Sequence, residues 1–182
     1  VLGTLPKALA ALGHDVVLLL PLYGEIDREK HGLTPAGIRL EVSLGSSVEE
    51  AWIWKAPLAP GSAGSGTAEA WFLDNRALYD RPSLYNQLDD AARFSFFSRA
   101  AAELFRAPPD GRRFDVLHAN DWQAALAPVH LKLLRQRDPS LAGLGSVFTI
   151  HNLAYQGLFP AESFPLTGLS WDHFNMRELE FW

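Results

Sequence analysis

Two short strand-like segments that turn polar at their ends constrain the fold of this chain more than any other feature. Residues 147–150 read Val-Phe-Thr-Ile, a β-branched and aromatic run typical of a buried strand, and His151 and Asn152 follow directly. Residues 114–117 form a second such strand, and the sequence His-Ala-Asn-Asp-Trp follows at 118–122. Ligands of open parallel sheets bind just outside the carboxyl ends of the strands. We therefore expect the two strand ends, joined by one helical crossover, to face one crevice.

Helical and strand-like patterns alternate along the chain, which is typical of an α/β protein. Apolar spacing predicts a helix that stops at Gly13, a long helix from Asp89 to a break at 108–111, and a helix that stops at 138–139. The expected inward residues are Leu5, Ala8, Leu9 and Leu12 in the first helix, Phe97, Ala100, Ala101, Leu104 and Phe105 in the second, and Leu126, Val129, Leu133 and Leu134 in the third. The apolar run 16–20 predicts a strand buried on both faces. Together these elements predict a Rossmann-like, doubly wound parallel sheet with right-handed crossovers.

Residues 24–74 change character and predict an antiparallel extension of that sheet. Residues 38–42 and part of 50–55 alternate with the period of a strand, and 70–73 form a further strand candidate. The glycine- and serine-rich segment 60–66 is low in complexity, and we expect it to be mobile. The tryptophans of these strands are expected in the core or on sheet faces; they are Trp52, Trp54 and Trp71.

Composition and charge argue against several classes of function. The chain has 182 residues, of which 48% are hydrophobic and 20% charged, as in an ordinary globular domain. A net charge of −5 without a Lys/Arg cluster argues against nucleic-acid binding, and no apolar run approaches the ~20 residues that span a bilayer. Because the sequence has no cysteine, it can form neither disulfides nor thiolate metal sites. The motifs G-x-G-x-x-G, Walker A and G-x-S-x-G do not occur, which weakens the dehydrogenase, NTPase and hydrolase interpretations.

The polar residues at the two strand ends are the leading candidates for a binding site. The imidazole of His151 can donate a hydrogen bond to a sugar hydroxyl or stabilise charge, and it can equally bond its own loop backbone. The amide of Asn152 suits hydroxyl groups as well as it suits pinning a turn. Asp121 directly precedes a helix-like segment, so from its position alone an N-cap is the favoured interpretation.

Other polar and aromatic residues near the strand ends allow more than one interpretation. His118 and Asn120 alternate with Ala119 and are expected to point to the same side of their strand. A metal site is not expected, because no His-x-x-x-His or carboxylate triad accompanies them. Trp122 suits either core packing or a platform for a sugar ring, and His130 is expected to be a hydrogen-bonded core histidine. The loop tyrosines suit either sugar stacking or loop packing; they are Tyr79, Tyr85 and Tyr155.

Several sequence blocks, taken in order, resemble the bacterial glycogen synthases and plant starch synthases that use a nucleotide-sugar donor. The most specific block is residues 148–157, Phe-Thr-Ile-His-Asn-Leu-Ala-Tyr-Gln-Gly, and the sequence at 118–122 supports it. The further blocks are residues 5–9, 13–16, 19–23, 72–75, 79–82 with Tyr85, 93–100 and 174–175. The resemblance thus extends over nearly the whole chain.

The resemblance implies a GT-B glycosyltransferase, with two Rossmann-like domains across a cleft and residues 1–182 as most of the acceptor-side N-terminal domain. The implied reaction is retaining transfer of glucose from ADP-glucose to the non-reducing end of an α-1,4-glucan, in glycogen biosynthesis, without a metal or other cofactor. It implies a bacterial cytoplasmic enzyme, or a plastid enzyme in a plant, with no nucleic-acid or membrane partner. By position, His151 and Asn152 would contact the donor glucose, Asp121 would lie with His151 at the reacting centre, and Trp122 and Tyr85 would contact the glucan acceptor.

The sequence departs from the family pattern in two respects. The family usually has a second histidine where this chain has Asn120, and the family's Lys-x-Gly-Gly-Leu loop would lie upstream of Val1. Both ends of the sequence look cut, and the C-terminal GT-B domain is missing from it, so we expect the chain alone to be inactive. The alternatives are a non-catalytic glucan-binding or regulatory module, and a GT-B enzyme with another nucleotide-sugar donor.

Overall fold

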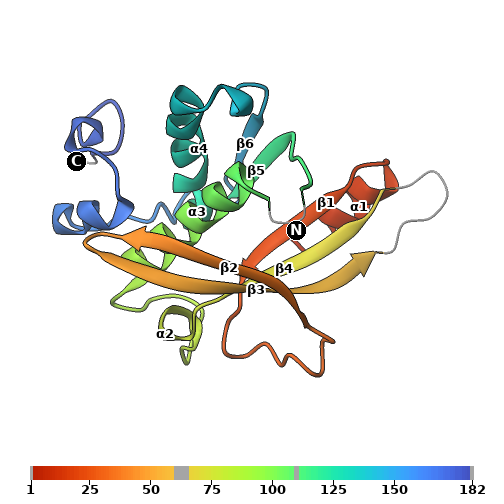
Figure 1. Cartoon of the computed structure of the whole chain (residues 1–182). Helices are drawn as coiled ribbons and strands as arrows, with labels where there is room; N and C mark the ends of the chain where they lie inside the picture. Colours follow the sequence, from red (N-terminus) through yellow and green to blue (C-terminus); the bar gives the residue numbers. More distant parts are fainter. Residues whose placement is uncertain (1, 60–65, 109–110, 181–182) are drawn as a thin grey trace. The chain divides into compact units, whose positions relative to one another are not determined.

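The computed structural model describes residues 2–59, 66–108 and 111–180 (Figure 1). The chain divides into two compact units. Residues 1–40 and 50–84 make up the first unit, and residues 41–49 and 85–182 make up the second. The strands form a four-stranded sheet of order β1-β4-β3-β2 and a two-stranded sheet of β5 and β6. The predicted α/β class is confirmed, and its parallel strands are divided between these two sheets. No helix in the described ranges is long and apolar enough to cross a membrane.

The four-stranded sheet combines a parallel pair with a hairpin (Figure 1). Its strands are β1 (Val16–Pro21), β2 (Thr34–Leu44), β3 (Ser47–Ala59) and β4 (Ala68–Asp74). β4 pairs in parallel with β1 and antiparallel with β3, so residues 70–73 join both kinds of ladder rather than the antiparallel one alone. The residues of β1 are mostly half-buried instead of buried on both faces, because β1 is an edge strand of its sheet.

The helices of the first unit are α1 (Leu5–Ala11) and α2 (Arg76–Tyr79). α1 packs on β1 and β4 and buries Pro6 and Ala10, whereas the predicted inward residue Leu12 is 75% exposed because it lies beyond the last helical residue. The side chain of Asn75 caps α2 by accepting a hydrogen bond from the backbone N–H of Leu78 at 3.0 Å.

The aromatic residues of the first unit have structural roles. Trp71 is buried at 2% exposure and Tyr79 at 0%, so both belong to the core. Trp54 donates a hydrogen bond from Nε1 to Asp74 Oδ2 at 3.1 Å, and Trp52 is 49% exposed on the sheet. The three tryptophans therefore lie in the core or on the sheet, as the sequence predicted. Of the glycine- and serine-rich segment 60–66, only Gly66 falls within the described residues.

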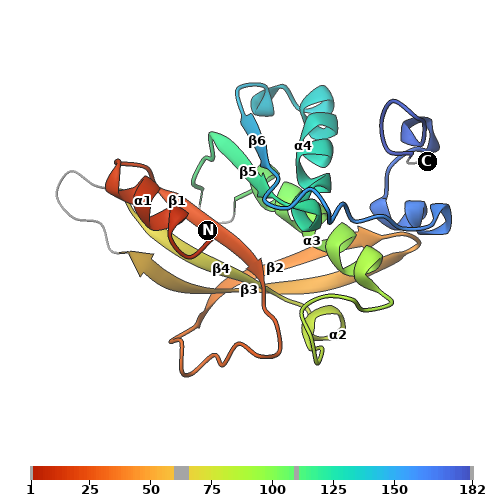
Figure 2. The same ribbon diagram turned by 180° about the vertical axis from the view of Figure 1, so that it is seen from behind.

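The second unit is a short parallel sheet with helices packed against it (Figure 2). Its regular elements are α3 (Asp90–Arg106), β5 (Val116–Asn120), α4 (Leu126–Arg137) and β6 (Gly145–Thr149). Among its described residues, four short 3₁₀ turns accompany them: η1 (Trp122–Ala124), η2 (Pro139–Leu141), η3 (Ala161–Thr167) and η4 (Trp171–His173). α4 connects β5 to β6 and packs against both strands and against α3, as a crossover helix must.

The burial of side chains was predicted well for α3 and less well for α4 and β6. Of the predicted α3 face, Phe97, Ala100, Ala101 and Leu104 are buried and Phe105 is half-buried. In α4 the buried residues are Ala127, His130 and Leu131, so the inward stripe lies one position away from Leu126 and Val129. β6 was expected to be buried, but Val147 and Phe148 are 47% and 45% exposed, because β6 is an edge strand of a two-stranded sheet.

Candidate active site at the carboxyl ends of β5 and β6

The two strand ends singled out by the sequence lie side by side. β5 and β6 pair in parallel with the register Val116↔Gly145 through Asn120↔Thr149, so their carboxyl ends reach the same edge of the sheet. The residues that follow are Asp121 and Trp122 after β5, and His151 and Asn152 two residues after β6. The predicted shared edge is therefore confirmed within the second unit.

Asp121 anchors the His151 loop instead of capping a helix. Its Oδ1 accepts a hydrogen bond from the backbone N–H of His151 at 2.7 Å, and its own N–H donates to the carbonyl oxygen of Thr149 at 2.9 Å. The side chain makes no capping hydrogen bond to η1, so the N-cap interpretation is wrong. The reason is the backbone of Asp121, whose φ of 56° and ψ of 178° direct the carboxylate towards the loop after β6.

The backbone conformation of Asp121 is strained. A positive φ combined with a ψ near 180° is almost confined to glycine and costs a non-glycine residue of order 1–3 kcal/mol. The hydrogen bonds to Thr149 and His151 hold the residue in this conformation. Strain of this kind collects at functional sites because the surrounding structure must enforce it.

A chain of polar side chains runs along the edge beneath His151. The ring nitrogen Nε2 of His151 lies 3.0 Å from Asn120 Oδ1, and Asn120 Nδ2 donates to the carbonyl oxygen of His118 at 3.3 Å. The ring of His118 in turn lies 2.7 Å from Thr149 through Nε2 and Oγ1. His118 and Asn120 thus stand on the same side of β5, as their alternation predicted.

The side chain of Asn152 is used within its own loop. Asn152 Oδ1 accepts a hydrogen bond from the N–H of Ala154 at 3.0 Å, and the Asn152 carbonyl accepts one from Tyr155 at 3.2 Å. Of its two suggested roles, pinning a turn is therefore the one that the structure displays. The side chain of His151 is exposed, and we find no hydrogen bond to its Nδ1 from the described residues. This nitrogen is available to a ligand.

Trp122 and Tyr85 belong to one aromatic cluster. The Trp122 ring packs edge-on against Phe94 at 4.9 Å between centroids and lies 5.6 Å from Phe159, while Tyr85 lies 6.1 Å from Phe94. The backbone of Gly157 lies so close to the Trp122 ring that a Cβ added at Gly157 would be 2.5 Å from Cε3 of Trp122. Trp122 is therefore half-buried, whereas Tyr85 is 44% exposed.

His130 is buried in α4, as expected, but its ring is not fully hydrogen-bonded. The side chain is 8% exposed, and Nε2 has no hydrogen-bond partner among the described residues. Burial, which disfavours the charged form, and the positive charge of Arg99 lower the pKa of His130 to about 4. The histidine is therefore neutral near pH 7.

This depressed pKa predicts an acid-sensitive stability. Because the folded pKa of about 4 lies below the unfolded value of 6.5, the unfolded chain binds the extra proton between these values. The free energy of unfolding is therefore highest above pH 6.5, and it falls by ~3 kcal/mol as the pH drops from 6.5 through 4. Urea unfolding at pH 7 and pH 4 should show a smaller acid loss for His130→Leu than for the wild type. The exposed-site control His31→Gln should behave like the wild type, and equal acid losses in all three proteins would contradict the prediction.

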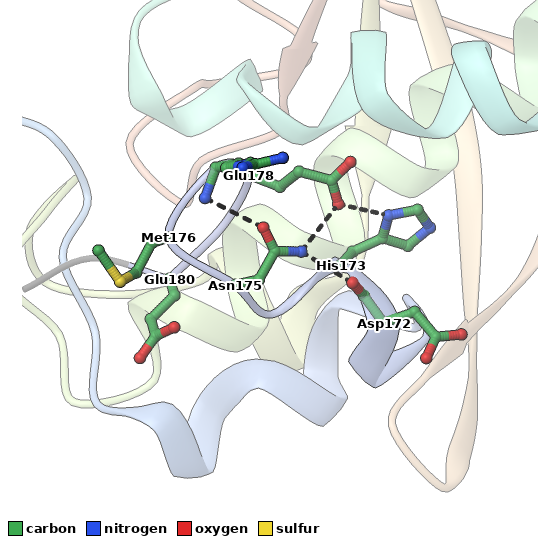
Figure 3. A pocket seen from close by; sticks show the side chains of 7 residues that line it. Asp172, His173, Asn175, Met176, Glu178 and Glu180 are labelled. Atoms are coloured by element: carbon green, nitrogen blue, oxygen red, sulfur yellow. Dashed lines mark hydrogen bonds and ion pairs between the residues drawn. The ribbon is translucent and has the colours of Figure 1, made fainter.

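A separate hollow of about 720 Å³ lies in the segment around η4 (Figure 3). The residues that line it are Asp172, His173, Asn175, Met176, Arg177, Glu178 and Glu180. Its polar groups bond one another: His173 Nδ1 lies 2.8 Å from Glu178 Oε2, which lowers the pKa of that carboxyl, and Asn175 donates to the Asp172 carbonyl at 2.8 Å. No residue spacing in the sequence predicted this hollow, although residues 174–175 belong to one of the blocks that resemble the family. No group of His, Asp and Glu residues suited to a metal ion occurs in the described part of the chain.

Known proteins match the chain along its full length. It is 40% identical over 187 residues to the glycogen synthase of Anaeromyxobacter dehalogenans (strain 2CP-C), a match that covers 100% of this chain and 36% of that protein. It is 39% identical to glycogen synthase 1 of Geobacter sulfurreducens, with 99% of this chain and 36% of that protein covered. The chain thus spans about a third of the length of these relatives.

A solved structure and a family profile agree with these relatives. The catalytic domain of starch synthase IV from Arabidopsis thaliana, bound to ADP and acarbose, superposes with a TM-score of 0.79 at 28% identity. The superposition covers 96% of this chain and 34% of that one. The profile of the starch synthase catalytic domain matches residues 1–182. The chain belongs to the starch synthase catalytic domain family.

Proposed function

We propose that this chain is the acceptor-side part of a glycogen synthase, which transfers glucose from ADP-glucose to the non-reducing end of an α-1,4-glucan with retention of configuration. The observation that carries the proposal is the arrangement of Asp121 and His151, which the β5–β6 register brings together on an exposed edge. Family membership and the bacterial glycogen synthases at about 40% identity support the reaction. Because these relatives come from bacteria, we further propose a bacterial enzyme that acts in the cytoplasm.

His151 contacts the donor glucose in this proposal. Its ring is exposed at the edge, and Nδ1 can exchange a hydrogen bond with a sugar hydroxyl. Asp121 holds the backbone of the His151 loop through Oδ1 and places negative charge near the developing positive charge of the sugar. Asn152 shapes the same loop through its hydrogen bond to Ala154, and it contributes to the donor site by holding that turn.

The remaining chemistry belongs to parts of the enzyme outside this sequence. Glycosyl transfer requires stabilisation of the leaving diphosphate as well as of the oxocarbenium-like sugar. The relatives are almost three times as long as this chain, and we propose that their further domain supplies the diphosphate contacts. The 182-residue chain by itself should therefore transfer no glucose, although the intact protein should.

The test is a transfer assay on the intact protein with glycogen as acceptor and ADP-glucose or UDP-glucose as donor. Preferred use of ADP-glucose is the expected result. Binding of glycogen without turnover of either donor would identify a glucan-binding or regulatory module instead. Preferred use of UDP-glucose, or of a small acceptor, would identify a different GT-B transferase.

Trp122→Ala tests the acceptor side of the proposal. The aromatic cluster of Trp122, Phe94 and Tyr85 offers ring surface for stacking on a glucose unit. We expect the variant to raise the KM for glycogen about tenfold, which corresponds to ~1.4 kcal/mol for the lost stacking contact, and to leave the Kd for ADP-glucose nearly unchanged. Because Trp122 also packs on Gly157, Phe159→Leu serves as the control for altered packing. An equal loss of acceptor and donor binding would contradict an acceptor role.

A further inference from the structure

The amide of Asn120 has only one orientation that satisfies both of its neighbours. Its Nδ2 lies 3.3 Å from the carbonyl oxygen of His118, and its Oδ1 lies 3.0 Å from Nε2 of His151. Rotation of the amide by 180° would set two acceptor oxygens against each other at His118. Asn120 therefore donates to His118 and presents an acceptor oxygen to His151.

An acceptor at this distance determines which ring nitrogen of His151 carries the proton. Nε2 must donate to Asn120 Oδ1, so the proton of the neutral imidazole resides on Nε2. The lone pair then lies on Nδ1, the nitrogen that we find without a partner among the described residues. Such a ring accepts a hydrogen bond from a hydroxyl group through Nδ1 and cannot donate one there.

The backbone of His151 is held independently of its ring. Asp121 Oδ1 binds the N–H of His151 at 2.7 Å, so the loop position depends on Asp121 while the ring depends on Asn120. The neighbouring polar pair, His118 with Thr149 at 2.7 Å, makes no hydrogen bond to His151. The three contacts can therefore be removed one at a time.

We propose that Asn120 is a positioning residue that keeps the His151 imidazole in its Nε2–H tautomer, with Nδ1 turned to the ligand as a hydrogen-bond acceptor. The proposal rests on the proposed function only for the identity of that ligand, a sugar hydroxyl of the donor glucose. The tautomer of the ring is a property of the protein without substrate, and it can be measured separately.

The experiment is ¹⁵N NMR of the intact protein labelled at histidine, in which the ring nitrogens report the tautomer directly. Residues 1–182 contribute six histidines to the spectrum, and the His151 signals are assigned with His151→Gln. We expect the wild type to show Nε2–H alone. Asn120→Leu removes the acceptor and should give a mixture of tautomers. Thr149→Val, which removes only the His118 contact, should match the wild type.

The variants also distinguish this inference from the proposed function. Asn120→Leu should lower kcat about tenfold, as for one lost hydrogen bond, without raising the KM for glycogen. A wild-type ring with its proton on Nδ1, or an unchanged tautomer in Asn120→Leu, would overturn the role of Asn120. If Asn120→Leu does not fold, the wild-type spectrum still tests the proposal, because a proton on Nδ1 of His151 would overturn it. If the tautomers change as expected but His151→Ala retains full turnover, the inference stands and the proposed function fails.

Discussion

Replacement of His151 with alanine in the intact enzyme is expected to lower kcat by about 100- to 1000-fold, the usual cost of removing one preorganised polar contact to a transition state. The melting temperature should change by less than about 2 °C, because surface substitutions rarely alter stability by more than ~0.5 kcal/mol. The ring is exposed, and its hydrogen bond within the described part of the chain is the one to Asn120. The backbone N–H that binds Asp121 remains in the variant.

A matched control comes from a second histidine of the same unit, the last residue of η4. His173 pairs with Glu178 at 2.8 Å in the segment around η4, and His173→Ala should retain nearly full kcat. Steady-state kinetics and thermal unfolding of both variants distinguish a role of the imidazole in turnover from a structural role. A His151→Ala protein that unfolds readily, yet keeps its activity per folded molecule, would show that the imidazole is only structural.

The second large effect is expected at Asp121, where activity and stability should fall together. Asp121→Ala removes the acceptor for the His151 N–H and leaves a non-glycine residue at a φ of 56°. The lost hydrogen bond should destabilise the fold by ~1–3 kcal/mol, and the displaced loop should lower kcat by about 100-fold or more. Urea unfolding and steady-state kinetics measure the two effects.

Two further variants separate the hydrogen bond from the backbone strain. Asp121→Gly lacks the same acceptor but adopts a positive φ freely, so it should be ~1 kcal/mol more stable than Asp121→Ala. Asp121→Asn keeps an acceptor oxygen without the charge and should be nearly as stable as the wild type. If the glycine variant is no more stable than the alanine variant, and alanine retains wild-type activity, Asp121 does not anchor the loop.

The location of the site could be predicted because it depends on local sequence and on simple sheet geometry. A β-branched run that turns polar at His151 marks a strand end, and the same signal occurs at residues 118–122. Parallel strands joined by one helix bring such ends to the same edge, and the β5–β6 register confirms it. The buried face of α3 was predictable for a similar reason, because many apolar residues repeat at helical spacing.

The role of Asp121 could not be predicted in this way. An aspartate before a helix-like segment is commonly a cap, and only its positive φ, set by contacts with Thr149 and His151, turns the carboxylate away. The role of Asn120 likewise depends on residues 31 positions away in sequence. These are tertiary contacts that no local pattern encodes.

Errors in predicted burial have a different cause. The apolar composition of residues 147–150 predicts a buried strand, but burial depends on how many strands flank it, and β6 has one neighbour. In α4 the small residue Ala127 and the polar His130 make the close contacts, whereas the larger Val129 is half-buried. Hydrophobicity alone therefore shifted the predicted inward stripe by one position.

The most direct test of the proposed site is a crystal structure of the intact enzyme with ADP-glucose bound. We predict that a hydroxyl of the donor glucose lies about 3 Å from Nδ1 of His151, while Asp121 Oδ1 still binds the N–H of that residue. A glucose ring bound away from the carboxyl ends of β5 and β6, with neither His151 nor Asp121 within hydrogen-bonding distance of the sugar, would contradict the proposal.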